Sequence, residues 1–535
     1  MNKAKVRSSG ILRLFFAVVL AAALWTPLPL SAQDAPTSDK PADQSSPAGA
    51  PAAASPAAQV PTTQEQPKPI PPPAQPSKDE SATDKDKDEE VKITPRQAEE
   101  LFHSVDEILE FDSKQTGLPI KKEVKRKLTS RDEVVSYLTK HVNDEDTKRL
   151  RRSELVLKKF GLLPRDFNLE TFLVALLREE VAGYYDPKTK TVNLLDWVPM
   201  EEQEPVMAHE LTHALQDQSI GMLKWMKKGE KDLAEIRKDP TPTDIENDEI
   251  DNAREAVIEG QAQAMMFQYA LAPTGHSITN SPALVDAMEE ETLTGTPSTK
   301  VFNDAPIFMK ESLTFPYSYG MQFVIKVMEK GGKEKAFAGV LQNPPHTTRQ
   351  IMQPETYLSG EKIEPMRVPD FKRDFKDYEK FDIGAMGEFD VAVLMEQYAG
   401  KPLSKKMYPE WRGGYYYAAK PRNHTKIDSD ASLGLLYVSR WSSADKAAEF
   451  AEIYARSLKQ RYKKANEAGE SDIDRAAVPD SEAGDLLKGR HAWTTEDGAV
   501  VIEEQGDTVF VSEGLDATTT ATLEREVFGA STAPK

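Results

Sequence analysis

Apolar residues recur at helical spacing through the first part of the chain that has the composition of a folded protein. Thr94-Pro95-Arg96-Gln97 has the residue types of a helix start: a capping threonine, a proline at the first helical position and a glutamine that completes a capping box. A second capping box runs from Ser130 to Glu133, and helical patterns follow near residues 155–163 and 172–178. The sequence therefore predicts an all-helical lead-in that begins at residue 94.

The pattern changes at residues 183–195, where aromatic and β-branched positions flank the turn-forming segment Asp-Pro-Lys-Thr. This arrangement predicts a short β-hairpin. Helical patterns return from about Glu204, at 252–271, and at 319–330, where Gly331-Gly332 is expected to end the helix. Residues 224–251 are strongly charged and contain two prolines, which indicates an exposed insertion.

The last third of the chain combines strand and helix patterns. Residues 415–417, 433–438, 499–502 and 509–511 have the composition of strands, and Gly506-Asp507 predicts a hairpin turn between the last two. Residues 444–462 and 517–527 are expected to be helices. The fold class is therefore predicted as α+β, with a mainly helical domain at 94–365 that carries a small edge hairpin, and a smaller α+β domain at 366–535.

The N-terminus has the features of a secretion signal. Residues 1–13 carry four positive charges and no acid, residues 14–25 are uninterruptedly apolar, and Ser31-Ala32 offers a small-residue cleavage site. We expect residues 1–32 to be removed, leaving no membrane span and a bacterial protein in the periplasm or the extracellular space. Residues 33–93 are rich in Pro and Ala with few large apolar side chains, which predicts a disordered linker.

Composition narrows the possible chemistry. The formal net charge of −19 argues against binding to nucleic acid, because that requires a positive surface. The chain has no cysteine, so it has neither a thiol nucleophile nor a thiolate metal ligand. Any metal must therefore be held by His, Asp or Glu.

The segment His209-Glu210-Leu211-Thr212-His213 is the strongest functional motif. Four-residue spacing on a helix places both imidazoles on one face, where they can bind a single zinc ion. Glu210 is rotated by roughly 100° from His209 and can act as a general base toward zinc-activated water. Asp217, one turn after His213, could hydrogen-bond to His213 on the side away from the metal, although a residue at such a position is more often solvated.

A catalytic zinc needs a third protein ligand and one open position. Glu255 and Glu259 lie one turn apart on one face of the next predicted helix, so the spacing allows either of them to ligate.

Two further segments resemble known zinc peptidases. Glu259-Gly260-Gln261-Ala262 is similar to the E-G-x-A element of gluzincins, the thermolysin-like and aminopeptidase-N-like enzymes, which implies a zincin-like domain with Glu259 as third ligand. Those families often have an acid or an aromatic residue four positions later, where this chain has Gln263. Pro316-Tyr317-Ser318-Tyr319-Gly320 resembles the P-Y-x-x-G element of aminopeptidase-N-like enzymes at the start of a helix, which implies that the Tyr317 hydroxyl stabilises the oxyanion.

A wider resemblance links the chain, from about residue 95, to a group of uncharacterised exported bacterial zincin-like proteins. It rests on Gly183-Tyr184-Tyr185-Asp186-Pro187, the H-E-L-T-H-A-L-Q-D-Q string at 209–218, and the T-x-Q-x-x-x-P-E-x-Y pattern at 348–357. We therefore expect an exported peptidase with one Zn²⁺ that hydrolyses a peptide or protein substrate. The alternative is a zincin scaffold that serves as a non-catalytic binding protein of the cell envelope.

Overall fold

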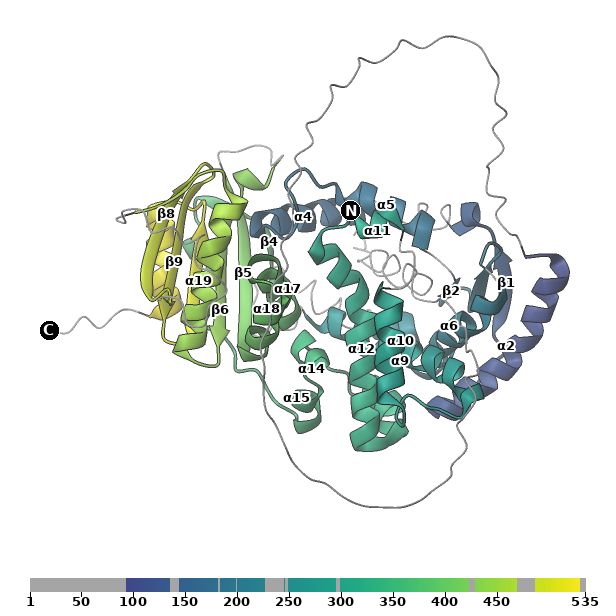
Figure 1. The fold of residues 1–535 in the computed structure, drawn as a ribbon. Coiled ribbons are helices and arrows are strands. Elements are labelled where there is room, and N and C mark those ends of the chain that lie inside the picture. The colour runs from purple at the N-terminus through teal and green to yellow at the C-terminus, as the bar shows by residue number, and fades with distance from the viewer. Residues whose placement is uncertain are drawn as a thin grey trace, which may run out of the picture. The chain divides into compact units, whose positions relative to one another are not determined.

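The computed structural model of the chain describes residues 93–134, 144–180, 183–198, 200–226, 245, 249–294, 299–422, 429–468 and 486–529. The predicted secretion signal, the predicted linker up to residue 92 and most of the predicted charged insertion lie outside these residues. Figure 1 shows the arrangement of the helices and strands. Among the described residues, no helix combines the length and the apolar character that a membrane crossing requires.

The lead-in begins as predicted but is not entirely helical. Helix α2 (Pro95–Thr116) has the expected capping box between Thr94 and Gln97, and Gly117 ends it with a positive φ of 76°. Strand β1 (Lys125–Thr129) follows, and then helices α4 (Asp144–Phe160) and α5 (Leu169–Glu180). The all-helical prediction was wrong at β1, because this edge strand is mostly charged and shows no apolar alternation.

The predicted hairpin is confirmed. Strands β2 (Gly183–Asp186) and β3 (Thr191–Leu195) pair in antiparallel fashion, and β1 joins β3 in parallel, which gives the strand order β1-β3-β2. Every residue of β2 is buried, and the strand contacts the helix that follows the hairpin.

Three long helices form the centre of the first part of the chain: α6 (Met200–Ile220), α9 (Ile250–Leu271) and α12 (Ile307–Glu334). Helix α9 packs against both of the others. Helix α6 begins before the predicted Glu204, and α12 begins well before Pro316, which lies inside the helix instead of at its start. Gly332 breaks the helical geometry with a φ of 77°, at the predicted place.

Shorter elements surround these helices. They are η2 (Ala272–Thr274), α10 (Pro282–Thr294), α11 (Lys300–Asn303), the π-helix η3 (Lys335–Gly339), α13 (Val340–Gln342), α14 (Thr348–Met352), α15 (Pro354–Ser359) and α16 (Phe371–Asp374).

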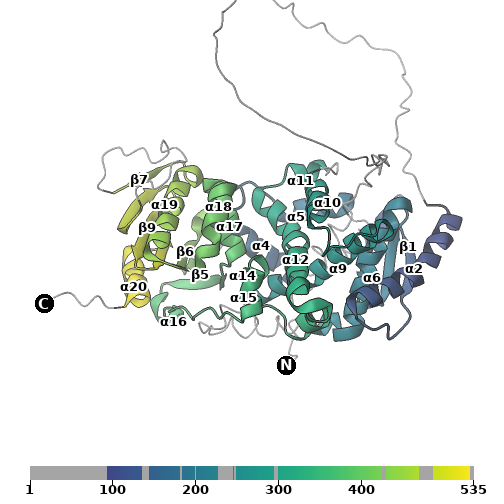
Figure 2. The same cartoon turned by 60° about the horizontal axis from the view of Figure 1, so that its bottom comes forward.

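The last third of the chain builds an antiparallel seven-stranded sheet in the order β4-β5-β6-β10-β9-β8-β7. Its strands are β4 (Tyr378–Ala385), β5 (Trp411–Pro421), β6 (Gly434–Trp441), β7 (Ala465–Glu467), β8 (Gly489–Thr495), β9 (Gly498–Gln505) and β10 (Thr508–Glu513). The helical segments are α17 (Glu388–Ala399), α18 (Lys401–Met407), η4 (Tyr408–Glu410), η5 (Asp430–Ser432), α19 (Ala444–Arg461) and α20 (Ala517–Phe528). The predicted β9–β10 hairpin is confirmed, and so is the α+β class, but β4, β7 and β8 were not predicted. Figure 2 shows β5, β6, β7 and β9 together with α19 and α20.

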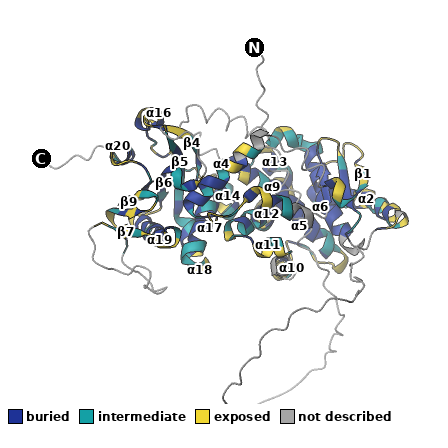
Figure 3. Cartoon of the chain, turned by 90° about the horizontal axis from the view of Figure 1, so that it is seen from above, coloured by how far each residue is buried: buried dark blue, intermediate teal, exposed yellow. Residues whose placement is uncertain are grey.

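The hydrophobic core runs through both parts of the described chain. One cluster of buried side chains contains Leu211 of α6 as well as Trp441 of β6. Phe160, at the end of α4, makes edge-on contacts with Tyr416 and Tyr437 of the seven-stranded sheet, at ring-centre distances of 5.8 and 5.5 Å. Figure 3 shows how much of α6 is buried. The predicted domain boundary at residue 365 stays a prediction.

Candidate metal centre

Helix α6 presents the residues of the H-E-x-x-H motif from a buried position. His209, Glu210 and His213 expose 0%, 2% and 6% of their surfaces. Apolar neighbours such as Met207 and Leu211 are fully buried, so the helix lies in the core instead of on the surface. Buried imidazoles and a buried carboxylate require partners, because leaving them without any would cost several kcal/mol.

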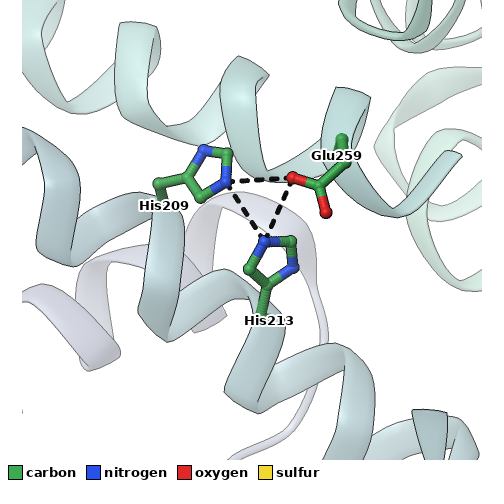
Figure 4. Close-up of side chains that lie close together, drawn as sticks. All are labelled: His209, His213 and Glu259. Carbon is green, nitrogen blue, oxygen red and sulfur yellow. Dashed lines mark hydrogen bonds and ion pairs between the residues drawn. The ribbon is translucent and has the colours of Figure 1, made fainter. Parts of the chain in front are cut away.

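Helix α9 supplies one of those partners, Glu259. Its Oε2 lies 3.2 Å from His209 Nε2 and 3.4 Å from His213 Nε2, and the two Nε2 atoms are 3.1 Å apart (Figure 4). Ligands at about 2.0–2.1 Å from a tetrahedral zinc ion lie roughly 3.3 Å from each other. The three observed separations match that spacing, so the group has the residue types and the dimensions to hold one metal ion.

The structure distinguishes between Glu255 and Glu259, which the sequence spacing allowed equally as the third metal ligand. His209, His213 and Glu259 are the candidate metal-binding group found among the described residues, and Glu255 is not part of it. Glu255 lies one helical turn before Glu259 and lines a cavity of about 280 Å³.

Charge within the group favours a cation between the three side chains. Burial would raise the pKa of the Glu259 carboxyl, but the neighbouring imidazoles lower it to about 2. Burial would likewise lower the pKa of His213, but the Glu259 carboxylate raises it to about 9. An arrangement that stabilises a proton between two imidazoles and a carboxylate also attracts a divalent cation to the same place.

Gln216 orients one of the two imidazoles. Its Oε1 accepts a hydrogen bond of 2.9 Å from His213 Nδ1, so Nδ1 carries the proton and the lone pair of Nε2 stays available for a metal. Its Nε2 donates to Ile258 O and to Gln261 Oε1, both at 3.0 Å. Gln261 in turn donates to the backbone of the π-helix η3. This network ties α6 to α9 beside the candidate ligands.

Asp217 is buried, so it is neither solvated nor a hydrogen-bond partner of His213. Its carboxylate accepts from the Tyr185 hydroxyl at 2.8 Å and from the backbone of Met222 at 2.9 Å, and it pairs with Lys190. Asp217 therefore holds the hairpin against α6 and does not contact His213. The three-residue spacing from His213 to Gln216, which also places the two on one helix face, was the pattern that could have identified the true partner.

The imidazole of His209 lacks a hydrogen-bond partner of the kind that Gln216 provides for His213. His209 Nδ1 is buried without a hydrogen-bond partner, and so is Gln263 Oε1, at the position where the gluzincins often have an acid or an aromatic residue. When Nε2 binds a metal, Nδ1 carries the proton and needs an acceptor. The hydrogen-bond support of His209 is therefore weaker than that of His213.

The side chain of Glu210, a residue of α6, contacts strand β2 of the hairpin. A backbone hydrogen bond from Tyr185 of β2 reaches its carboxylate, and a Cβ added to Gly183 of the same strand would lie 3.5 Å from Glu210 Cγ. Burial raises the pKa of the Glu210 carboxyl, although the two imidazoles oppose this. The raised pKa makes it a better proton acceptor, as a general base requires.

Tyr317 of α12 reaches the same group. Its ring stacks on His209 at a centre-to-centre distance of 6.0 Å and an angle of 25°, and its hydroxyl hydrogen-bonds to Glu259. Burial, reinforced by the nearby acids, raises the pKa of Tyr317 well above its usual value. The hydroxyl therefore stays protonated and can donate a hydrogen bond.

Two glycines bring α9 and α12 close together, one from each of the two motifs that resemble zinc peptidases. A Cβ added to Gly260 would lie 2.2 Å from the backbone carbon of Gly320, and a Cβ added to Gly320 would lie 2.2 Å from the carbonyl oxygen of Ala256. Only glycine allows this contact, and it lies next to Glu259 and one turn from Tyr317. Sequence reasoning gave no role to either glycine.

No protein-family model matches this chain, and neither the curated proteins nor the solved structures contain a match to it. The resemblance to gluzincins thus rests on the motifs, and their geometry is the basis for a functional proposal.

Proposed function

We propose that this chain is an exported zinc-dependent peptidase. The observation that carries the proposal is the convergence of His209, His213 and Glu259 to separations of 3.1–3.4 Å, with Glu210 beside them. Two imidazoles and a carboxylate form a ligand set typical of catalytic zinc, which keeps a fourth position for water or substrate. The assignment of peptides as the substrate comes from the resemblance to gluzincins.

Glu210 and Tyr317 would have separate roles in hydrolysis. Zinc, when bound, would supply Lewis-acid activation of water and of the scissile carbonyl. Glu210 would accept the proton of the attacking water at its carboxylate and then pass it to the leaving amine. Tyr317 would turn its hydroxyl from Glu259 toward the developing oxyanion and donate a hydrogen bond there.

A test separates metal binding from catalysis. The Glu210→Gln variant should retain one zinc ion per chain and lose hydrolysis of a quenched-fluorescence peptide library, because Gln cannot accept the proton. Glu204→Gln is the matched control: it lies on the same helix, but its carboxylate contacts Ser104 and Tyr269. The control should hydrolyse at the wild-type rate, and a chelator should abolish that activity. Unchanged turnover in Glu210→Gln would contradict the mechanism.

One observation favours the alternative, a zincin scaffold that binds a partner without catalysis. The candidate ligands are almost fully buried; the side chain of His213, with 8% exposed, is the most accessible of the three. A buried metal ion can be purely structural. In that case the chain would contain zinc, yet the peptide library would stay intact with and without chelator.

A further inference from the structure

A second cavity, of about 360 Å³, lies where the two parts of the described chain meet. It is lined by the end of α4 and the segment after it, by the start of α12, and by residues of α17 and α19. Its volume falls in the range of about 300–1000 Å³ that is typical of small-molecule sites. A ligand in this cavity would contact both parts of the chain at once.

Positive charge lines the cavity. Its cationic residues are Lys158, Lys159, Arg165 and Arg461, and of the described residues that line it none is Asp or Glu. Three of the four lie around the ring of Tyr462, which also lines the cavity: Lys159 Nζ is 5.9 Å from the ring centre, and Cζ of Arg165 and of Arg461 are 5.5 and 5.3 Å from it. These three cations therefore form one group beside the cavity.

Acids outside the lining balance part of this charge. Three of the four cations have such partners: Arg461 pairs with Glu513, Arg165 with Asp430 and Asp497, and Lys158 with Glu154. The anionic partners lie behind the cavity wall, so the groups that a ligand would meet are the donors.

Lys159 has no hydrogen-bond partner. The residue exposes only 2% of its surface, and Nζ is buried without an acceptor. Burial lowers the pKa of its ammonium group, although the charge of Glu513 opposes this. An ammonium group has three donors, and burying them without acceptors is costly. Nε of Arg461 is likewise buried without a partner. Two residues that line the cavity thus have donors that an anion could satisfy.

Helix α12 adds a third source of donors. Pro306 and Ile307, the cap and the first residue of this helix, both line the cavity. Proline has no side-chain acceptor, so Pro306 makes no capping hydrogen bond to the first N–H groups of the helix. These N–H groups and the helix dipole favour an anion at this end of α12.

We infer that this cavity binds a phosphate group, either as the free anion or as part of a small phosphorylated molecule. A phosphate monoester carries about −1.5 to −2 charges at pH 7 and several acceptor oxygens, so it can satisfy lysine, arginine and helix donors together. A carboxylate has only two oxygens and one charge. The inference is independent of the proposed peptidase function, because no member of the candidate metal group is among the described residues that line this cavity.

Calorimetric titration of the purified chain, dialysed into a phosphate-free buffer, tests the site. The probes are inorganic phosphate and glycerol 3-phosphate, with acetate at equal ionic strength as the carboxylate comparison. We expect one phosphate site per chain, with affinity at least about tenfold above that for acetate, as hydrogen bonds between charged groups imply. Tighter binding of glycerol 3-phosphate would identify a phosphorylated molecule as the ligand, and tighter binding of inorganic phosphate would identify the free anion.

Ile307→Glu and Ile307→Gln form a matched pair of variants. Ile307 is 39% exposed, and the two new side chains have the same shape but differ in charge. An acid in the first turn of a helix suits its dipole, so Ile307→Glu should fold normally. It should bind phosphate about tenfold more weakly than Ile307→Gln, because its carboxylate repels the anion and competes for the same donors.

Lys159→Met tests the buried ammonium group directly. Methionine retains the apolar stem, and phosphate binding should weaken about 10–100-fold with the loss of a charged hydrogen bond. Lys459→Met is the control, because Lys459 is an exposed residue of α19 that does not line the cavity, and its affinity should match the wild type. The inference would be overturned by a wild-type chain that binds no phosphate or binds acetate as tightly, by equal affinities in the two Ile307 variants, or by equal losses in the two lysine variants.

Discussion

Replacing Gly260 by alanine should force apart the two helices that carry Glu259 and Tyr317. The added Cβ would lie 2.2 Å from Gly320 C, 2.3 Å from its O and 2.6 Å from its Cα. The shortest of these distances is about 1.2 Å less than the 3.4 Å at which ordinary contact begins. The obstructing atoms are backbone, so no side-chain rotation can relieve the clash, and α9 must shift against α12.

The structure allows a rough magnitude for this effect. Overpacking of a core costs about 1–3 kcal/mol, and the helix propensity gained from Gly to Ala offsets about 1 kcal/mol of it. Because the contact joins two backbones, we place the cost at the upper end, which leaves a net loss of about 1–2 kcal/mol. A displacement near 1 Å at a catalytic group can lower the rate about 100-fold. The effect on hydrolysis should therefore exceed the effect on stability.

The assay combines thermal unfolding, zinc affinity by chelator competition, and peptide hydrolysis. Gly331→Ala is the matched control: it makes the same substitution on α12, but the atom nearest to the added Cβ is Cδ of the exposed Lys335 side chain, which can rotate away. Gly260→Ala should lower the melting temperature, the zinc affinity and the rate, and Gly331→Ala should lower none of them. A Gly260→Ala variant that matches the wild type in all three would refute the close-contact reasoning.

Three more predictions concern single side chains. Tyr317→Phe should keep the zinc and lower kcat about 10²–10³-fold, measured by steady-state kinetics, because an oxyanion donor is lost. Gln216→Leu should weaken zinc binding about 10–100-fold in chelator competition, whereas Gln218→Leu, whose side chain contacts the 121–122 backbone instead, should not. Burial raises the pKa of Glu249 from 4.5 to about 8, so the folded chain retains a proton that the unfolded chain releases, and stability should fall as pH rises from about 5 to 8. Glu249→Gln should reduce that decline in melting temperature; an unchanged pH profile would show that Glu249 does not cause it.

Much of the fold could be predicted where local chemistry determines the structure. The capping box at Thr94 and the turn at Gly506-Asp507 were predicted because a few adjacent residues specify each of them. Strand β1 could not be predicted, because its sequence Lys-Arg-Lys-Leu-Thr reflects an exposed edge. Pro316 suggested a helix start, since proline is favoured there, but in the structure it lies inside α12.

The same distinction between local geometry and packing applies to the candidate site. The spacing of His209 and His213 predicted their shared helix face, because helical geometry alone determines it. Spacing could not choose between Glu255 and Glu259, which lie on one face of α9; the packing of α9 against α6 decides it. The contact of Gln216 with His213 lies within α6 and could have been found from their three-residue spacing, whereas the bonds of Gln216 to Ile258 and Gln261 depend on the packing of α6 against α9.

The most direct test of the central claim is the zinc content of the purified chain and of two glutamate variants, measured by elemental analysis after dialysis. The wild type and Glu255→Ala should each retain one zinc ion per chain, and Glu259→Ala should lose it, because Glu259 is the residue that completes the group with His209 and His213 in the described part of the chain. Equal zinc content in Glu259→Ala and the wild type, or no zinc in the wild type, would contradict the account.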